Sequence, residues 1–246
     1  MNLAIDIGNS FTKCAIFEKQ KLVKVFVFDE LNLKNIKNIL AKNKKIKSVI
    51  LSSVVKHSKE INKFLSVHFN FTELTYQTFL PIKNLYQTKE TLGNDRIAAA
   101  VAANAMFPNK NVLIIDIGTC IKYDFVNNKN EYLGGGISPG LLMRFKALNN
   151  FTDKLPLHTP DPSQRGEIRL IGNTTEASIR SGVQNGMLAE IIGIIGEYEN
   201  KFKNLKIILA GGDTDFFERK IKKTIFADPH LVLKGLNLIL NFNEKK

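Results

Sequence analysis

The sequence predicts an α/β fold made of two duplicated domains. The opening segment, AIDIGNSFTKCAIF at 4–17, returns as IIDIGTCIKYDFV at 114–126. The shared Asp-Ile-Gly triplet begins at Asp6 in the first copy and at Asp116 in the second, 110 residues later in a chain of 246. A repeat at nearly half the chain length indicates a duplication. Predicted strands and helices are mixed in both halves, which is typical of α/β proteins, and we expect a cleft between the halves.

The first half, expected as a domain at 1–108, starts with an apolar, branched run that suits a buried strand, followed by a polar turn at 8–12. An alanine-rich run with Pro108 just beyond it predicts a helix that stops there. The expected elements are strands at 2–7, 13–17 and 46–54 and helices at 31–45, 56–69 and 95–106.

The second half, expected as a domain at 109–246, repeats the strand, turn and strand, and then carries a glycine run at 134–136. A polar, proline-containing loop is expected at 152–166. The other expected elements are strands at 112–117, 121–126 and 205–209 and helices near 139–150, 174–203 and 230–242.

Composition excludes several protein classes. The chain is 44% hydrophobic and 24% charged, which is ordinary for a globular protein with a real core. No stretch approaches the roughly 20 apolar residues that span a bilayer, so we expect no membrane partner. The N-terminus carries Asp6 and no basic region, so it is not typical of a signal peptide. Cys14 and Cys120 have no histidine at metal-binding spacing, which predicts two reduced thiols in a cytoplasmic protein.

The net charge of +12 raises the question of nucleic-acid binding. The excess is mostly lysine, scattered in runs such as 42–47 and 201–206, without aromatic interleaving of the RNA-binding type. We therefore favour solvated lysine faces, with nucleic-acid binding as the alternative.

The two Asp-Ile-Gly turns carry the strongest functional signal. A glycine at a strand tip lets the backbone approach a phosphate, and successive N–H groups form an anion-binding concavity. An aspartate at the strand end can hold a cation that bridges to phosphate oxygens. One such turn is most often an ordinary β-turn, but two copies at half-chain spacing favour a kinase. A third glycine site, at 211–213, favours equally an approach to the adenosine of a nucleotide and a tight strand-to-helix turn.

In this order the three sites resemble the two phosphate motifs and the adenosine motif of the actin-like (ribonuclease H-like), sugar-kinase and Hsp70 superfamily. Within it, the sequence resembles the type III pantothenate kinases of bacterial coenzyme A biosynthesis. The matching segments are DIGNSFTK at 6–13, GNDR at 93–96, DIGTCIKYD at 116–124, GGGISPGL at 134–141, TTEASIRSG at 174–182 and DPHLVLKGL at 228–236.

The resemblance implies two actin-like domains with an intervening nucleotide cleft, and ATP-dependent phosphorylation of pantothenate by a cytoplasmic homodimer whose partner subunit completes the pantothenate pocket. It implies Mg²⁺ near Asp6 and a monovalent cation, K⁺ or NH₄⁺, at Asp116. The residues that it assigns to ATP are Asp6, Ile7, Gly8, Asn9, Ser10, Phe11, Thr12, Lys13 and Thr119.

The resemblance also assigns the pantothenate site. Asp95 would be the base that takes the proton from the hydroxyl, and the other contacts would come from Tyr86, Gly93, Asn94, Arg96 and Thr175. From the residues alone, Asp95 is more often a helix cap with a carboxylate favoured by the helix dipole. Arg96 could grip the pantothenate carboxylate in a bidentate pair, and Tyr86 could be a packed aromatic.

The second turn departs from the family pattern. It reads GTCIKYD, where the family more often has a small residue and then threonine, so Cys120 and Lys122 are unusual. Lys122 either faces solvent or supplies a local positive charge. The third motif reads GGDT in place of the more common GGDA. Two other functions stay open: another phosphotransferase or phosphatase of the superfamily, and a non-enzymatic accessory factor of transcription.

Overall fold

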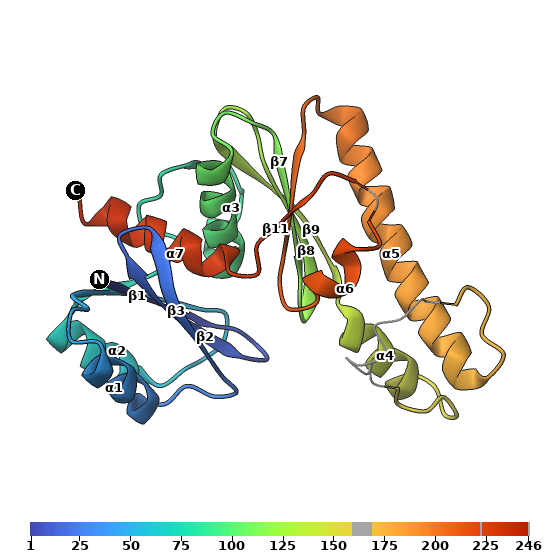
Figure 1. The fold of residues 1–246 in the computed structure, drawn as a ribbon, viewed down its shortest axis with the longest axis horizontal. Coiled ribbons are helices and arrows are strands. Elements are labelled where there is room, and N and C mark those ends of the chain that lie inside the picture. Colours follow the sequence, from blue (N-terminus) through green and yellow to red (C-terminus); the bar gives the residue numbers. More distant parts are fainter. Residues whose placement is uncertain (159–168, 222, 246) are drawn as a thin grey trace. The chain divides into compact units, whose positions relative to one another are not determined.

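The computed structural model describes residues 1–158, 169–221 and 223–245, and divides the chain into two compact units (Figure 1). Unit 1 comprises Met1–Asn109, Val126–Gly134 and His230–Lys246. Unit 2 comprises Lys110–Phe125 and Gly135–Pro229. The first change of unit therefore lies one residue from the boundary expected after residue 108, while two later segments return to unit 1.

The sheet of unit 1 has five strands in the order β3-β2-β1-β4-β5. β1 is antiparallel to β2 and parallel to β4, so Asp6 has Lys13 as its register partner on one side and Ser52 on the other. The aspartate thus sits where polar residues end two neighbouring strands. The strand bounds are β1 Asn2–Ile7, β2 Thr12–Glu18, β3 Lys21–Phe28, β4 Ser48–Ser53 and β5 Asn70–Glu73.

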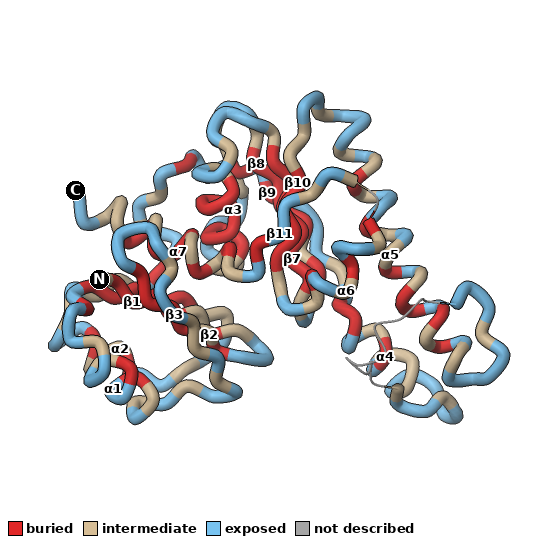
Figure 2. The backbone as a smooth tube through the Cα atoms, viewed as in Figure 1, coloured by how far each residue is buried: buried red, intermediate tan, exposed pale blue. Residues whose placement is uncertain are grey.

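Helices cover both faces of this sheet. α1 (Leu33–Lys42) and α2 (Lys59–His68) bury Ile36 and Leu65 in one core cluster with β1, β2 and β4. α3 (Asn94–Met106) and α7 (Leu231–Asn243) pack closely together on the other side. Gly235 permits this approach, because a Cβ there would collide with the carbonyl of Ala98. Figure 2 shows the resulting buried residues on β1 and on α3. The short segments β6 (Lys83–Asn84) and η1 (Lys89–Thr91) precede α3.

The second sheet has the strand order β11-β10-β7-β8-β9-β6. In unit 2, the helices α4, α5 and α6 share one core cluster with β7, β8 and β10, in which Phe145, Met187, Ile191 and Phe217 are nearly or fully buried. The bounds are β7 Val112–Ile117, β8 Cys120–Val126, β9 Glu131–Pro139, β10 Lys206–Ala210, β11 Phe226–Ala227, α4 Leu141–Asn150, α5 Thr175–Lys201 and α6 Thr214–Glu218.

The expected α/β class is confirmed, and each strand and helix expected from the sequence is present within a few residues of its predicted bounds. The prediction missed β3, β5, β6, β9, β11 and α6, and the glycine run at 134–136 lies inside β9. β3 was not predicted because it is an edge strand. Its residues are exposed or half-buried, so its sequence shows no strict alternation of apolar and polar residues. Of the loop expected at 152–166, residues 159–166 lie outside the described residues.

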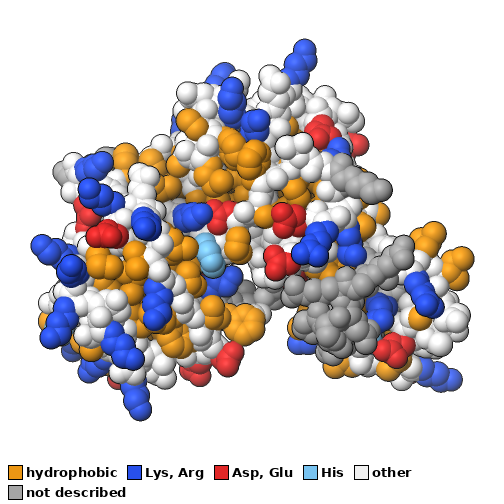
Figure 3. Space-filling view, viewed as in Figure 1, with side chains coloured by type: hydrophobic (Ala, Val, Ile, Leu, Met, Phe, Trp, Pro, Cys, Tyr) orange, Lys and Arg blue, Asp and Glu red, His pale blue; other side chains and the backbone are white. Residues whose placement is uncertain are grey.

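Among the helices that the structure describes, none combines the length and the apolar character that crossing a bilayer requires. On the face seen in Figure 3, Lys and Arg side chains are interspersed with apolar and neutral ones.

Candidate functional site

The first Asp-Ile-Gly turn joins β1 to β2 in unit 1. The hydroxyl of Ser52, at the end of β4, donates to Oδ1 of Asp6 at 3.2 Å. The amide of Gly8 donates to the carbonyl of Phe11 at 3.1 Å and closes a tight turn. Asn9 and its two successors are exposed at the tip, with Phe11 52% exposed, whereas Ile7 and Thr12 are buried. The turn therefore presents a tip of two polar residues and one aromatic residue, with a half-buried carboxylate behind it.

The cysteine behind this turn is inert. Cys14 lies fully buried in β2, and burial, followed by the nearby charge of Asp6, raises the pKa of its thiol to about 12. A thiol with such a pKa carries almost no thiolate at neutral pH. Cys14 is therefore a core residue and no nucleophile.

The GNDR segment begins α3 in unit 1. Oδ1 of Asp95 accepts a hydrogen bond from the amide of Arg96 at 2.9 Å, in the first turn of the helix. A Cβ on Gly93 would come within 2.6 Å of that same oxygen, so the lack of a side chain at Gly93 leaves room for the Asp95 carboxylate. The side-chain amide of Asn94 donates to the carbonyl oxygens of Leu74 at 2.9 Å and Ser53 at 3.4 Å.

The end of β4 links GNDR to the first turn. Ser52 binds Asp6, and the carbonyl of the next residue, Ser53, accepts the bond from Asn94. Val54 in turn donates its amide to the carbonyl of Ile7 at 3.1 Å. Unit 1 thus brings together the predicted phosphate turn and the predicted base.

Arg96 and Tyr86 also meet in unit 1. The guanidinium of Arg96, which is 5% exposed as a residue, lies over the ring of Tyr86 at 5.6 Å, a cation–π arrangement. The Tyr86 ring is 6.2 Å from that of Tyr132 in β9. Gly134 adopts a φ of +100°, and a Cβ there would come within 3.0 Å of the Tyr86 ring. The arginine is therefore held in a fixed direction by an aromatic support.

The second Asp-Ile-Gly turn joins β7 to β8 in unit 2. The amide of Gly118 donates to the carbonyl of Cys120 at 3.1 Å, and Thr119 is exposed at the tip. Two further glycines pack closely against the backbone of this turn. A Cβ on Gly140 would collide with the carbonyl of Gly118, and one on Gly211, whose φ is +95°, would collide with that of Ile117. The third glycine site is thus a tight turn whose glycine is required by conformation and contact.

Asp116 is paired in this second turn. Its Oδ2 lies 2.6 Å from Nζ of Lys122, which returns along β8, and the two side chains are only 12% and 18% exposed. Of the two interpretations of Lys122, the local positive charge is the one observed. Among the described residues, no group of three or more His, Cys, Asp or Glu side chains is arranged as a metal site.

Thr175 begins α5 in unit 2, directly after the N-cap residue Thr174, whose hydroxyl accepts from the amide of Ala177 at 3.1 Å. Its position is exposed. It lines an open pocket with Leu148, Leu155, Gly172, Asn173, Thr174, Ser178 and Ile179.

Sequence reasoning missed several residues that shape these turns. Ser52 could have been found, because the pair Ser52-Ser53 directly follows the apolar run 49–51 and polar residues at strand ends often form sites. Gly140 lies in the GGGISPGL segment, but its contact with Gly118 could not be predicted, and Tyr132 carried no local signal, because their partners Gly118 and Tyr86 are distant in the sequence.

Comparison with known proteins identifies the family. A family model described as type III pantothenate kinase matches residues 2–197. A type III pantothenate kinase of Phocaeicola vulgatus is 48% identical over 246 residues, which is 100% of both chains. Such identity over the full length leaves no part of this chain without a counterpart in the relative.

Solved structures bear on the fold. A Campylobacter jejuni protein assigned to the Baf family of transcriptional activators aligns with a TM-score of 0.64 and 22% identity, covering 99% of this chain and 100% of that one. A Listeria monocytogenes protein assigned as an N-acetylmannosamine kinase aligns with a TM-score of 0.54 and 11% identity, covering 99% of both. These likenesses confirm the expected actin-like and sugar-kinase class of fold. By the family model and the full-length relative, the chain belongs to the type III pantothenate kinase family.

Proposed function

We infer that this chain transfers the γ-phosphoryl group of ATP to pantothenate, giving ADP and 4′-phosphopantothenate at the first step of coenzyme A biosynthesis. The observation that carries the inference is the match to type III pantothenate kinases along the whole chain. The geometry supports it, because the chain presents the Asp-Ile-Gly turn twice, each time behind a largely buried strand. Phosphoryl transfer depends on such positioning and charge neutralisation rather than on covalent chemistry.

Asp95 is the base in this proposal. A general base must lie within hydrogen-bond reach of the proton that it accepts, and its direction must be fixed. The bond from the Arg96 amide and the absence of a side chain at Gly93 fix the Asp95 carboxylate at the start of α3. From there it takes the proton of the primary hydroxyl of pantothenate as the hydroxyl oxygen attacks the γ-phosphorus in line.

Pantothenate is held by its carboxylate. Arg96 offers a planar donor fork suited to a carboxylate, and the Tyr86 ring keeps the guanidinium in one direction. Gly93, Asn94 and Thr175 complete the proposed contacts, with Asn94 acting chiefly through its bonds to Leu74 and Ser53.

ATP is the proposed ligand of both turns, bound by residues 6–13 and by Thr119. Mg²⁺ typically uses one or two carboxylates together with phosphate oxygens and water. Asp6 fits this requirement, because it is half-buried at a strand end beside the hydroxyl of Ser52. When bound there, Mg²⁺ would neutralise charge on the phosphates. At Asp116 the residues fit a further cation poorly, because the ammonium of Lys122 already lies at 2.6 Å.

A homodimer in the cytoplasm is the proposed assembly. Phe151, Leu170 and Ile171 are 87%, 80% and 81% exposed, and they follow α4 or precede α5 near the pocket of Thr175. Large apolar side chains that are this exposed suit an interaction surface. A partner subunit on this surface would complete the pantothenate pocket. Light scattering of the purified protein at micromolar concentration measures the mass directly, and a monomer there would contradict the assembly.

The test of function compares substrates and one matched pair of variants. ADP release is measured by a coupled assay with pantothenate, with a panel of sugars and with polyphosphate. We expect the wild type and Asp29→Asn to turn over pantothenate and Asp95→Asn not to do so. Asp29 is the control because it is exposed in the same unit. The wild type and the control should also restore growth of a strain that lacks pantothenate kinase. Turnover of a sugar alone would point to another phosphotransferase, and DNA binding without any turnover would point to a transcription factor.

A further inference from the structure

The ion pair in the second turn is largely enclosed, although it lies next to the solvent-exposed tip. Nζ of Lys122 lies 2.6 Å from Oδ2 of Asp116, and the two side chains are 18% and 12% exposed. A charge-assisted bond of this length is strong, and screening by water is weak where little water reaches. The ammonium is therefore a fixed positive charge between the ends of β7 and β8.

The other oxygen of the same carboxylate is also covered. A Cβ on Gly211 would come within 2.6 Å of Oδ1 of Asp116, so the backbone of the 211–213 turn lies against that oxygen. A monovalent ion needs several oxygen ligands around it. The enclosed carboxylate faces a lysine on one side and a peptide backbone on the other, and this arrangement does not fit an additional K⁺ or NH₄⁺ ion at Asp116.

We propose that the ammonium group of Lys122 is itself the permanent monovalent cation of the second turn, so that phosphate binding by Thr119 and its neighbours needs no added K⁺ or NH₄⁺. The inference rests on the proposed function for its kinetic test. A primary ammonium group carries the charge and the N–H donors of an ammonium ion. Because it is tethered to β8, no ion has to be captured from solution.

A purely structural ion pair is the competing interpretation. Removing two charges from water costs free energy that their attraction often fails to recover, so an enclosed pair is weak evidence for a stabilising role. A positive charge beside a phosphate-binding turn, in contrast, acts on the bound phosphates. The two interpretations differ in one measurable respect. If the ammonium of Lys122 replaces a cation, added K⁺ should restore activity that is lost when Lys122 is substituted, whereas K⁺ should not restore it if the pair is purely structural.

The first experiment is a salt series on the wild type, for which no variant has to fold. Initial rates with ATP, Mg²⁺ and pantothenate are measured in choline chloride and in KCl or NH₄Cl at equal ionic strength. We expect the wild-type rate to change by less than about twofold between these salts. A rise of about tenfold or more with KCl would overturn the proposal, because the site would then be taking its cation from solution.

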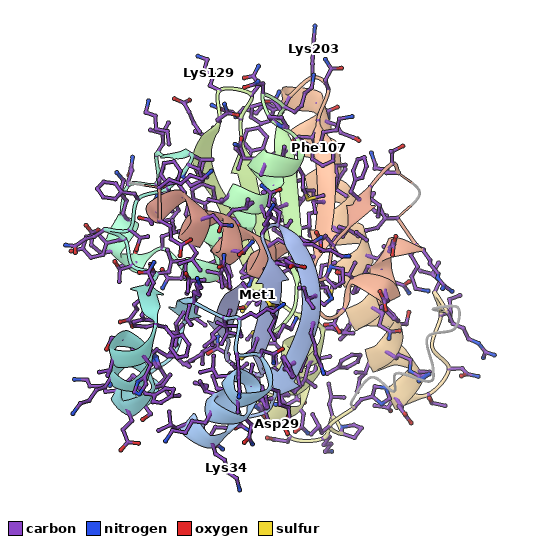
Figure 4. All side chains as sticks on the ribbon, turned by 60° about the vertical axis from the view of Figure 1, so that its left-hand side comes forward. Met1, Asp29, Lys34, Phe107, Lys129 and Lys203 are labelled. Carbon is purple, nitrogen blue, oxygen red and sulfur yellow. The ribbon has the colours of Figure 1, made fainter. Side chains whose placement is uncertain are left out.

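The second experiment removes the ammonium. In Lys122→Thr and Lys122→Met we expect the rate in choline chloride to fall about tenfold or more, and KCl or NH₄Cl to restore part of it in Lys122→Thr, whose hydroxyl can help to ligate an ion. Lys203→Met is the matched control, because Lys203 is exposed in the same unit and its side chain points away from the protein in Figure 4. Equal loss in all salts for both Lys122 variants would overturn the proposal.

A binding measurement separates this inference from the proposed function. Thermal unfolding is followed with Mg·ADP in KCl and in choline chloride, because a ligand that binds only the folded protein raises Tm. We expect K⁺ to raise the Tm of Lys122→Thr by several degrees more than that of the wild type or Lys203→Met. If pantothenate is not turned over in any salt, the proposed function fails, and this Tm difference still decides the role of Lys122.

Discussion

The two Asp-Ile-Gly turns share a sequence motif but differ in the groups that lie against their aspartates. In the first turn Asp6 is half-buried and accepts a bond from the neutral hydroxyl of Ser52. In the second, Asp116 is only 8% exposed and is paired with the ammonium of Lys122. One carboxylate therefore lies beside a serine hydroxyl, whereas the other lies beside the ammonium of a lysine in its own hairpin. The same motif can thus place its aspartate in two different electrostatic surroundings.

The turns also differ in their packing. A Cβ on Gly8 would meet only the carbonyl of Phe11, at 3.0 Å and within the same turn. In the second turn, in contrast, Gly140 and Gly211 from two distant segments pack closely against the turn backbone. The second turn is therefore built into the packing of unit 2, while the first closes through its own backbone.

A hydrogen-bonded network holds the segment that carries Gly140. Nε of Arg144 donates to the carbonyl of Pro139 at 2.8 Å, and its guanidinium pairs with Glu190 of α5. The hydroxyl of Tyr123, in β8, donates to the same glutamate at 2.8 Å. Burial and the neighbouring Glu190 raise the pKa of Tyr123, so it remains a donor at all physiological pH values. The network thus ties β8, α5 and the start of α4 around the second turn.

The largest effect should come from the packed glycines. Gly211→Ala adds a methyl group at a positive φ and against the carbonyl of Ile117, so we expect a loss of about 3 kcal/mol in the free energy of unfolding. Gly8→Ala should cost less than about 1 kcal/mol. Urea unfolding monitored by circular dichroism measures both. Similar losses in the two variants would remove the packing difference between the turns.

The aspartates should separate activity from stability. Asp6→Asn should lower kcat/KM about a hundredfold, or about 2.7 kcal/mol, because the proposed Mg²⁺ ligand loses its charge. Its free energy of unfolding should change little. Asp116→Asn should lower that free energy by about 2 kcal/mol, since it takes the carboxylate partner away from an enclosed ammonium. Steady-state kinetics and urea unfolding of both variants provide the comparison, which would be wrong if Asp6→Asn were the less stable of the two.

The network around the second turn should respond weakly to acid. Burial raises the pKa of Glu190, but hydrogen bonds from Arg144, Tyr123 and Ser138 outweigh it and hold that pKa below the usual 4.5. The stabilisation is therefore present above pH 4.5 and is lost as the pH falls through the lower pKa of the folded protein. Because the group is partly exposed, we expect less than about 1 kcal/mol. Glu190→Gln should flatten this part of the pH profile of the free energy of unfolding, while Glu60→Gln, an exposed control in unit 1, should not.

The smallest effect is a labelling difference between the two turns. Cys14 is fully buried with a pKa of about 12, whereas Cys120 is half-buried at the second turn. Iodoacetamide at pH 8 should therefore modify Cys120 in the native protein and both cysteines after unfolding. Mass spectrometry of the peptides reads the sites, and rapid native modification of Cys14 would show that the core of unit 1 opens readily.

Much of the fold followed from local patterns, and the misses have a common cause. Apolar runs such as 2–7 and 112–117 identify central strands because both faces are buried. β3 and β9 lack such runs, since exposed residues alternate irregularly along them and glycines interrupt β9. The residues of the candidate site also divide into those that a local sequence pattern marks and those that only long-range contacts reveal. Asp6 and Asp116 were predicted from the repeat, but Ser52 and Gly140 were not.

The sequence by itself determined the fold class, the two turns and the family, because the strand patterns and motifs are properties of neighbouring residues. Only the tertiary structure decided the partners of the aspartates. Ser52 reaches Asp6 across 46 residues through the register of β1 and β4, and Gly211 reaches Asp116 through that of β7 and β10. Whether Lys122 faced solvent or Asp116 depended on burial around the hairpin, and burial is a property of the packed chain.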